Sequence, residues 1–137
     1  MRVVVVEERR SGLSVERIRR DVRCAVRALG HRRHLPHELT VVFISPRESR
    51  ALNRRFRRKR QPSNVLSFNY GSVAEVIVTP AVVRREARAR GEPFTDQLRR
   101  TMIHGLIHLL GVHHENSDRH ARRFERLERC ALARLKL

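Results

Sequence analysis

The hydrophobic positions of this chain fall into short apolar runs that read as strands. Val3–Val6 and Leu39–Ile44 are continuous aliphatic and β-branched segments of the length typical of buried strands. Val65–Tyr70 predicts a third strand, and Gly71-Ser72 supplies turn residues directly after it. Ala74–Thr79 then reads as its hairpin partner. The pattern therefore predicts about four strands.

Helical spacing of apolar residues occupies most of the remaining chain. Ser14 can cap a helix that ends at Gly30, and Pro46 suits the first position of a second helix. Thr79 and Gly91 bound a third helix in the same way. These boundary residues predict helices between the strands and a change to helix alone after residue 79.

The last third of the chain predicts two further helices, one from about 96 to 110 with Thr95 as its cap and one starting near Ser117. The first of these is apolar on nearly every side in its second half, which is typical of a helix buried within a domain. The order of elements predicts a single α+β domain over residues 1–137. It should hold one mixed sheet of about four strands, with helices mainly on one face and the buried helix at the centre.

Three histidines near the end of this buried helix predict a metal site. His104 and His108 are four residues apart, so they share one helix face. Gly111 follows where a left-handed cap would end the helix, and such a turn can direct His114 toward the same point. Three imidazoles with an open fourth position are typical of catalytic zinc. The alternative is three histidines satisfied by hydrogen bonds, and the spacing across a glycine turn favours the metal.

Neighbouring residues refine this prediction. Metzincin proteases place a general-base Glu after the first histidine of this spacing, but this chain has Gly105 there, which argues against peptide hydrolysis. For His113, simple exposure is favoured over a role as a further ligand or supporting group. Another group of histidines recurs every third residue, at His31, His34 and His37. Pro36 interrupts that group, so a solvated loop is favoured over a second metal site.

Charge points to a polyanionic partner. The chain has 31 Lys and Arg against 14 Asp and Glu, a formal net charge of +17, which attracts nucleic acid above all. The densest basic run is Arg54–Arg60, which we interpret as phosphate-contacting, although such a run can also be a solvated face and arginine can reflect a GC-rich genome. Aromatic residues make up only 4% of the chain, so we expect recognition by backbone and shape.

The cysteines and the N-terminus predict a cytoplasmic protein. Cys24 and Cys130 fall in helical patterns and form no C-x-x-C pair, so buried thiols in a reducing compartment are favoured over a disulfide. The apolar run Val3–Val6 is too short for a signal peptide or a membrane span. We therefore expect no association with a membrane.

Three sequence blocks resemble those of the YbeY family, bacterial endoribonucleases implicated in ribosomal RNA maturation. The blocks are H-G-L-I-H-L-L-G-V-H-H at His104–His114, P-S-N-V-L-S-F at Pro62–Phe68, and Leu52-Asn53 followed by Phe56-Arg57. The order and spacing of the predicted elements also agree with that family from end to end. The resemblance therefore covers nearly the whole chain.

The resemblance implies one zinc ion per chain, held by His104, His108 and His114 with a position open to water. It also implies that Arg57 is the catalytic arginine, carrying the charge that builds on phosphorus. The implied activity is single-strand-specific endoribonuclease cleavage in ribosomal RNA processing, including maturation of the 16S 3′ end, and in ribosome quality control. The implied partners are ribosomal RNA and the small ribosomal subunit.

Some positions depart from the family pattern. His113 stands where the family usually has Asp, Ser63 where it has Thr, and Ala74 where it has Gly. Glu75 is a candidate general base, although an ordinary strand carboxylate is favoured. The alternative function is a ribosome-associated RNA-binding factor with a structural zinc, which would normally need a fourth ligand. A third, weaker hypothesis is a metal hydrolase with a substrate other than RNA.

Overall fold

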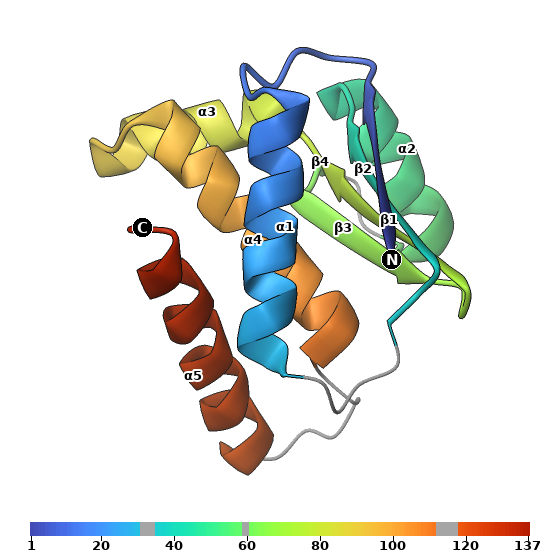
Figure 1. The fold of residues 1–137 in the computed structure, drawn as a ribbon. Coiled ribbons are helices and arrows are strands. Elements are labelled where there is room, and N and C mark those ends of the chain that lie inside the picture. The colour runs from blue at the N-terminus through green and yellow to red at the C-terminus, as the bar shows by residue number, and fades with distance from the viewer. Residues whose placement is uncertain (31–34, 59–60, 112–117) are drawn as a thin grey trace.

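The chain alternates strands and helices up to the fourth strand and is helical from there to its end (Figure 1). The structure, a computed structural model, describes residues 1–30, 35–58, 61–111 and 118–137. The elements are β1 (Arg2–Glu7), α1 (Val15–Leu29), β2 (Glu38–Phe43), α2 (Pro46–Phe56), β3 (Val65–Asn69), β4 (Val73–Val78), α3 (Pro80–Arg90), α4 (Phe94–Gly111) and α5 (Asp118–Arg134).

The four strands form one mixed sheet in the order β1-β2-β4-β3. β1 pairs with β2 and β2 pairs with β4 in parallel, so that Val3 lies opposite Leu39 and Leu39 opposite Ala74. β3 pairs with β4 as an antiparallel hairpin, with Phe68 opposite Glu75. The predicted α+β class and four-stranded mixed sheet are confirmed, and β3 lies at an edge of the sheet.

The two faces of the sheet are covered unequally, because alternate residues of a strand point to opposite sides. One face carries the main core, to which β2 and β4 contribute fully buried residues: Leu39, Val41, Phe43, Ala74, Val76 and Val78. The other face carries a small cluster of Ile44, Leu66 and Ile77, against which Leu52 of α2 packs. Figure 1 shows α2 on one side of the sheet and α1, α4 and α5 on the other. The predicted placement of helices mainly on one face is confirmed.

Helix α4 is the centre of the main core, as predicted, and contacts α1, α3, α5, β3 and β4. Its inward side is fully buried at Met102, Ile103, Leu106 and Ile107. The predicted cap at Thr95 is wrong, because the helix already begins at Phe94. The Arg84 guanidinium lies 4.1 Å from the Phe94 ring centroid, a contact between α3 and α4 that fixes this first turn. The helix includes Gly111, and the turn predicted to follow lies outside the described residues.

Local signals set the starts of the first two helices. The Ser14 hydroxyl accepts a hydrogen bond from the backbone N–H of Arg17, and Ser45 does the same for Glu48. A buried ion pair then joins α1 to α4, with Arg99 donating to both carboxylate oxygens of Asp21 at 2.7 and 3.1 Å. This pair fixes how the two helices pack.

The thiols and the helix lengths complete the description. Cys24 on α1 is half-buried and Cys130 on α5 is exposed, and both thiols are free. The prediction of burial is therefore wrong for Cys130, which lies on the outer side of the last helix. None of the helices in the described part of the chain is long and apolar enough to cross a membrane.

Candidate metal centre

His104 and His108 lie side by side on α4, as their spacing predicted. Their ring centroids are 4.5 Å apart, with the rings inclined at 77°. His104 is half-buried and His108 is exposed, so both imidazoles face away from the core and are open to solvent. The helix is buried on its other sides, and this open face suits a site that a substrate must reach. His113 and His114 lie outside the described residues, so the third ligand stays a prediction.

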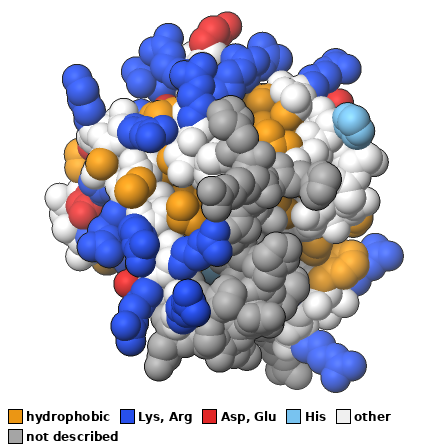
Figure 2. Space-filling model, turned by 60° about the horizontal axis from the view of Figure 1, so that its bottom comes forward, with side chains coloured by type: hydrophobic (Ala, Val, Ile, Leu, Met, Phe, Trp, Pro, Cys, Tyr) orange, Lys and Arg blue, Asp and Glu red, His pale blue; other side chains and the backbone are white. Residues whose placement is uncertain are grey.

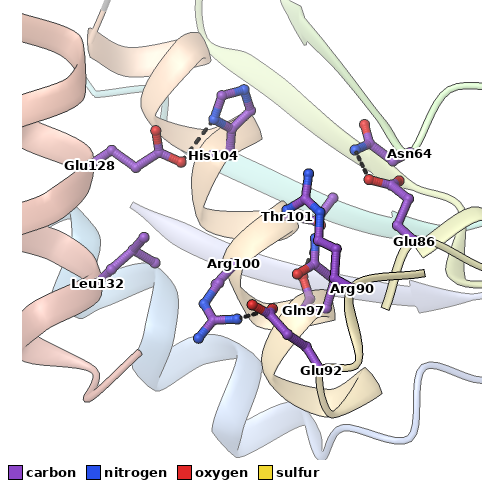
Figure 3. A pocket seen from close by; sticks show the side chains of 10 residues that line it. All are labelled: Asn64, Glu86, Arg90, Glu92, Gln97, Arg100, Thr101, His104, Glu128 and Leu132. Carbon is purple, nitrogen blue, oxygen red and sulfur yellow. Dashed lines mark hydrogen bonds and ion pairs between the residues drawn. The ribbon is translucent and has the colours of Figure 1, made fainter. Parts of the chain in front are cut away.

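A carboxylate from α5 contacts the first histidine. Glu128 Oε1 lies 2.8 Å from His104 Nδ1, and the Glu128 side chain is partly buried (Figure 3). A carboxylate at Nδ1 holds the proton there and leaves Nε2 as the acceptor, which is how metal-binding histidines are usually supported. The motif comparison missed Glu128. The signal available was its position four residues after Phe124 and three before Ala131, on the inward side of α5.

The surroundings of His108 favour its neutral form. Phe124 packs against both imidazoles, with its ring centroid 4.1 Å from that of His108 and 5.4 Å from that of His104. Partial burial lowers the pKa of His108 below its ordinary value of 6.5; the adjacent His104 lowers it further and Glu128 opposes the shift. A neutral imidazole is the form that binds a metal. The donor atoms of this pair therefore fit a zinc ion, although the described residues contain no group of three potential ligands.

The residue between the two histidines is packed tightly on the sheet. A Cβ atom added to Gly105 would lie 2.5 Å from Val65 Cγ2 and 3.3 Å from Val76 Cγ1. The Ser67 hydroxyl also donates to the Gly105 carbonyl oxygen at 2.8 Å. Position 105 therefore has no room for the glutamate of a metzincin protease. This gives a steric reason, in addition to the sequence pattern, against peptide hydrolysis.

A pocket of about 350 Å³ opens beside His104, between α3, α4 and α5 (Figure 3). Its lining is polar and of mixed charge, with Glu86 and Arg90 from α3 and Arg100 from α4. Arg100 forms an ion pair with Glu92, which leaves less positive charge for an anion. Among the motif residues, Asn64 lines the pocket and its amide donates to Glu86 at 3.4 Å. The pocket gives a polar group access to His104.

Two other motif residues hold a loop in place. The Asn53 amide donates to the Gln61 carbonyl oxygen at 2.6 Å and to the Ser63 hydroxyl at 2.9 Å. The Ser63 backbone N–H in turn donates to the Ser49 hydroxyl at 2.9 Å. Asn53 and Ser49 are fully buried, so these bonds anchor the segment before β3 to α2. Serine at position 63 keeps the hydroxyl that the family threonine would supply.

Arg57 lies at the end of α2, and α2 covers the sheet face opposite α4. Its side chain is exposed, and among the described residues it forms no hydrogen bond or ion pair. It does not line the pocket beside His104. Glu75 also lies on the α2 side of the sheet. Its neighbour Val76 faces Gly105 of α4, and adjacent residues of a strand point to opposite faces. The structure does not bring Arg57 or Glu75 into contact with the histidine pair.

The remaining predicted residues are exposed where they are described. Arg54, Arg55 and Arg58 are exposed at the end of α2, while residues 59 and 60 of the basic run lie outside the described part. Of the second histidine group, His37 is exposed, and His31 and His34 lie outside the described residues. Figure 2 shows one face of the molecule, on which Lys and Arg side chains clearly outnumber Asp and Glu.

Comparisons with known proteins agree with the motif resemblance. A family model described as Endoribonuclease YbeY matches residues 4–136. A curated relative, Endoribonuclease YbeY of Aquifex aeolicus, is 30% identical over 139 residues, covering 96% of this chain and 91% of the relative. The protein of the same description from Chromohalobacter salexigens is 41% identical over 105 residues, covering 71% of this chain and 68% of the relative.

A solved structure supports the fold. The solution structure of TM1509 from Thermotoga maritima is similar to this chain with a TM-score of 0.62 and 23% identity, covering 98% of this chain and 91% of that one. The family match spans nearly the whole sequence and includes both described histidines and Arg57. The chain therefore belongs to the YbeY family of endoribonucleases, which are metal-dependent hydrolases.

Proposed function

We propose that this protein is a zinc-dependent, single-strand-specific endoribonuclease that acts in the cytoplasm on ribosomal RNA, including the 3′ end of the small-subunit RNA. One zinc ion per chain is held by His104, His108 and His114. The observation that carries this proposal is the pairing of the His104 and His108 imidazoles on a face open to solvent, with His104 Nδ1 in contact with the Glu128 carboxylate. Three imidazole ligands with a position open to water, the first of them supported by a carboxylate, match the ligand set of a catalytic rather than a closed zinc site.

The residues present have defined tasks in such a mechanism. When bound, zinc supplies a water of lowered pKa, about 7 in typical sites, and polarises a phosphoryl oxygen. Glu128 keeps the proton on His104 Nδ1 and fixes the ring orientation. Phe124 contacts both rings, edge to face with His104 and tilted against His108, and so limits the orientations open to them. The pocket between α3, α4 and α5 admits the polar groups of a nucleotide beside His104.

Arg57 remains the proposed catalytic arginine, on the strength of its place in the family motif. Its guanidinium is exposed and unpaired within the described part of the chain, so it is available to an RNA phosphate. Arg57→Ala should lower cleavage much more than Arg55→Ala, which removes an equal charge two residues away. Equal losses in the two variants would reduce Arg57 to one phosphate contact among several.

The function is tested by metal analysis of the purified protein together with an RNA cleavage assay. We expect about one zinc per chain, cleavage of single-stranded ribosomal RNA, and loss of cleavage on adding a chelator or on His108→Ala. The alternative function is an RNA-binding factor with a structural zinc. Binding of ribosomal RNA without cleavage, with His108→Ala changing only thermal stability, would establish that alternative and overturn the enzyme proposal.

A further inference from the structure

Half of the aromatic residues gather in one exposed group on the side of the sheet away from the histidines. The chain has five Phe and one Tyr. The Phe56 ring meets the Phe68 ring edge to face at 5.5 Å between centroids, and Phe68 stacks on Tyr70 at 6.3 Å. We call Phe56, Phe68 and Tyr70 the aromatic ladder. It joins the last residue of α2 to β3 and to the turn that follows β3.

The two ends of the aromatic ladder are open to solvent. Phe56 is 54% exposed and Tyr70 is 62% exposed, more than any other large hydrophobic residue in the described part of the chain. Phe68 is half-buried and packs on the small cluster that includes Leu66 and Ile77. The Phe68 ring therefore has a structural role. The Phe56 and Tyr70 rings leave much of their surface exposed to water, although aromatic residues are scarce in this chain.

The outer rings are held by regular backbone. The Tyr70 N–H donates to the Val73 carbonyl oxygen at 2.9 Å, closing the hairpin around Gly71. Gly71 has a φ of 91°, which an L side chain rarely adopts, and its N–H donates to the Asn69 side chain at 2.9 Å. Phe56 is the last residue of α2. The ordered backbone and the contacts with Phe68 restrict both outer rings, so they lose less conformational entropy when a flat ligand stacks on them.

Arginine side chains adjoin the Phe56 end of the aromatic ladder, whereas Glu75 lies opposite Phe68 in the sheet. The Arg55 guanidinium lies 5.2 Å from the Phe56 ring centroid, and Arg54, Arg57 and Arg58 are exposed beside it. Among the described residues, none of these four arginines forms an ion pair with a carboxylate. Exposed aromatic faces flanked by unpaired guanidinium groups match the two chemical components of single-stranded RNA, which are flat bases and a phosphate backbone.

We propose that the aromatic ladder is a stacking platform for the bases of single-stranded RNA, with Arg54 and Arg55 contacting the adjacent phosphates. This inference rests on the proposed RNA substrate and extends it to a site away from the histidines. It differs from the expectation, drawn from the low aromatic content, that recognition uses backbone and shape, and the experiment below decides between the two. The few aromatics are concentrated where they can stack.

The edge strand β3 connects this platform to the histidine pair. Ser67 donates to Gly105, the residue after His104, from one face of β3. The next residue, Phe68, belongs to the aromatic ladder on the other face. Because β3 lies at the edge of the sheet, a single strand of RNA passing around that edge can reach both. The platform would hold RNA nucleotides a short distance along the RNA strand from the nucleotide beside the histidine pair.

Intrinsic fluorescence gives a direct test, because Tyr70 is the only tyrosine and the chain has no tryptophan. The full-length protein is titrated with a 2′-O-methyl oligouridylate of about 10 nucleotides, within the usual site size of single-strand binders. A parallel titration uses an oligomer of the same length and sugar that lacks bases. We expect quenching of Tyr70 by the first oligomer and much weaker quenching by the second.

Variants separate stacking from charge and from folding. Because Tyr70 variants lose the only tyrosine, binding by all variants is measured from the fluorescence anisotropy of end-labelled oligomers. Tyr70→Leu and Phe56→Leu keep an apolar side chain but remove the aromatic face, and each should weaken binding of the base-bearing oligomer by about 5- to 150-fold. Binding of the abasic oligomer should be unchanged, and Tyr70→Phe should bind like the wild type. Val15→Ala serves as the control, because it shortens an exposed apolar residue on α1, away from the aromatic ladder.

The outcomes are distinct from those of the cleavage test. Equal quenching by the two oligomers, or unchanged affinity in both leucine variants with thermal stability preserved, would overturn the platform even if the enzyme cleaves RNA. Absence of metal-dependent cleavage would overturn the proposed function, while base-dependent quenching of Tyr70 would still support the platform as an RNA-binding surface.

Discussion

Gly105→Ala tests whether close packing of α4 on β3 sets the position of the histidine pair. Two effects oppose each other in this variant. Alanine in a helix interior is favoured over glycine by about 1 kcal/mol. Against this, the new Cβ would lie 2.5 Å from Val65 Cγ2, closer than carbon atoms approach without displacement. Val65 is β-branched and stiff at χ1, so the methyl group cannot simply rotate away.

The steric effect should be the larger one. Overpacking in a well-packed core costs about 1–3 kcal/mol. The added Cβ would also lie 3.2 Å from Ser67 Oγ, whose hydrogen bond to the Gly105 carbonyl ties the helix to the strand. We therefore expect Gly105→Ala to lower the free energy of unfolding by about 1 kcal/mol net, measured by urea denaturation in the presence of a chelator.

A double-mutant cycle isolates the contact. Val65→Ala removes the two methyl groups, at a cost of up to about 1.6 kcal/mol from about 0.8 kcal/mol for each, less because the residue is only half-buried. In that background Gly105→Ala should become neutral or stabilising, with a coupling energy of about 0.5–3 kcal/mol between the two sites. Strictly additive effects, or a stabilised single variant, would refute the steric argument.

The remaining predictions concern charges. Glu128→Gln should weaken zinc binding about 10- to 100-fold in a chelator competition, whereas Glu125→Gln, an exposed change on the same helix, should not; equal affinities would remove Glu128 from the site. Asp21→Ala should lower the free energy of unfolding by about 3–5 kcal/mol, because it leaves Arg99 buried without its partner, and a loss below about 1 kcal/mol in urea denaturation would contradict this. The pKa of His108 is lowered on folding, so below about pH 6.5 the unfolded chain binds a proton that the folded chain does not. The metal-free protein should therefore lose stability from about pH 6.5 downward until the folded-state pKa is passed, and denaturation at several pH values should show a smaller loss in His108→Gln.

Short-range features of this protein followed from the sequence by itself. The helix starts at Ser14 and Ser45 and the left-handed residue Gly91 were predictable, because a cap depends on groups within three or four residues. The shared face of His104 and His108 follows from helix geometry alone. Family membership also rested on contiguous motifs, so it needed no knowledge of which elements pack together.

Only the tertiary structure decided which distant groups meet. Asp21 and Arg99 are 78 residues apart, and Glu128 is 24 residues from His104, so no local pattern could pair them. Phe68 and Tyr70 of the aromatic ladder are close in sequence, but its third ring, Phe56, comes from helix α2. Side-chain type and spacing fix what a residue can do, whereas burial and partners depend on how whole elements pack, since packing joins positions that local interactions never connect.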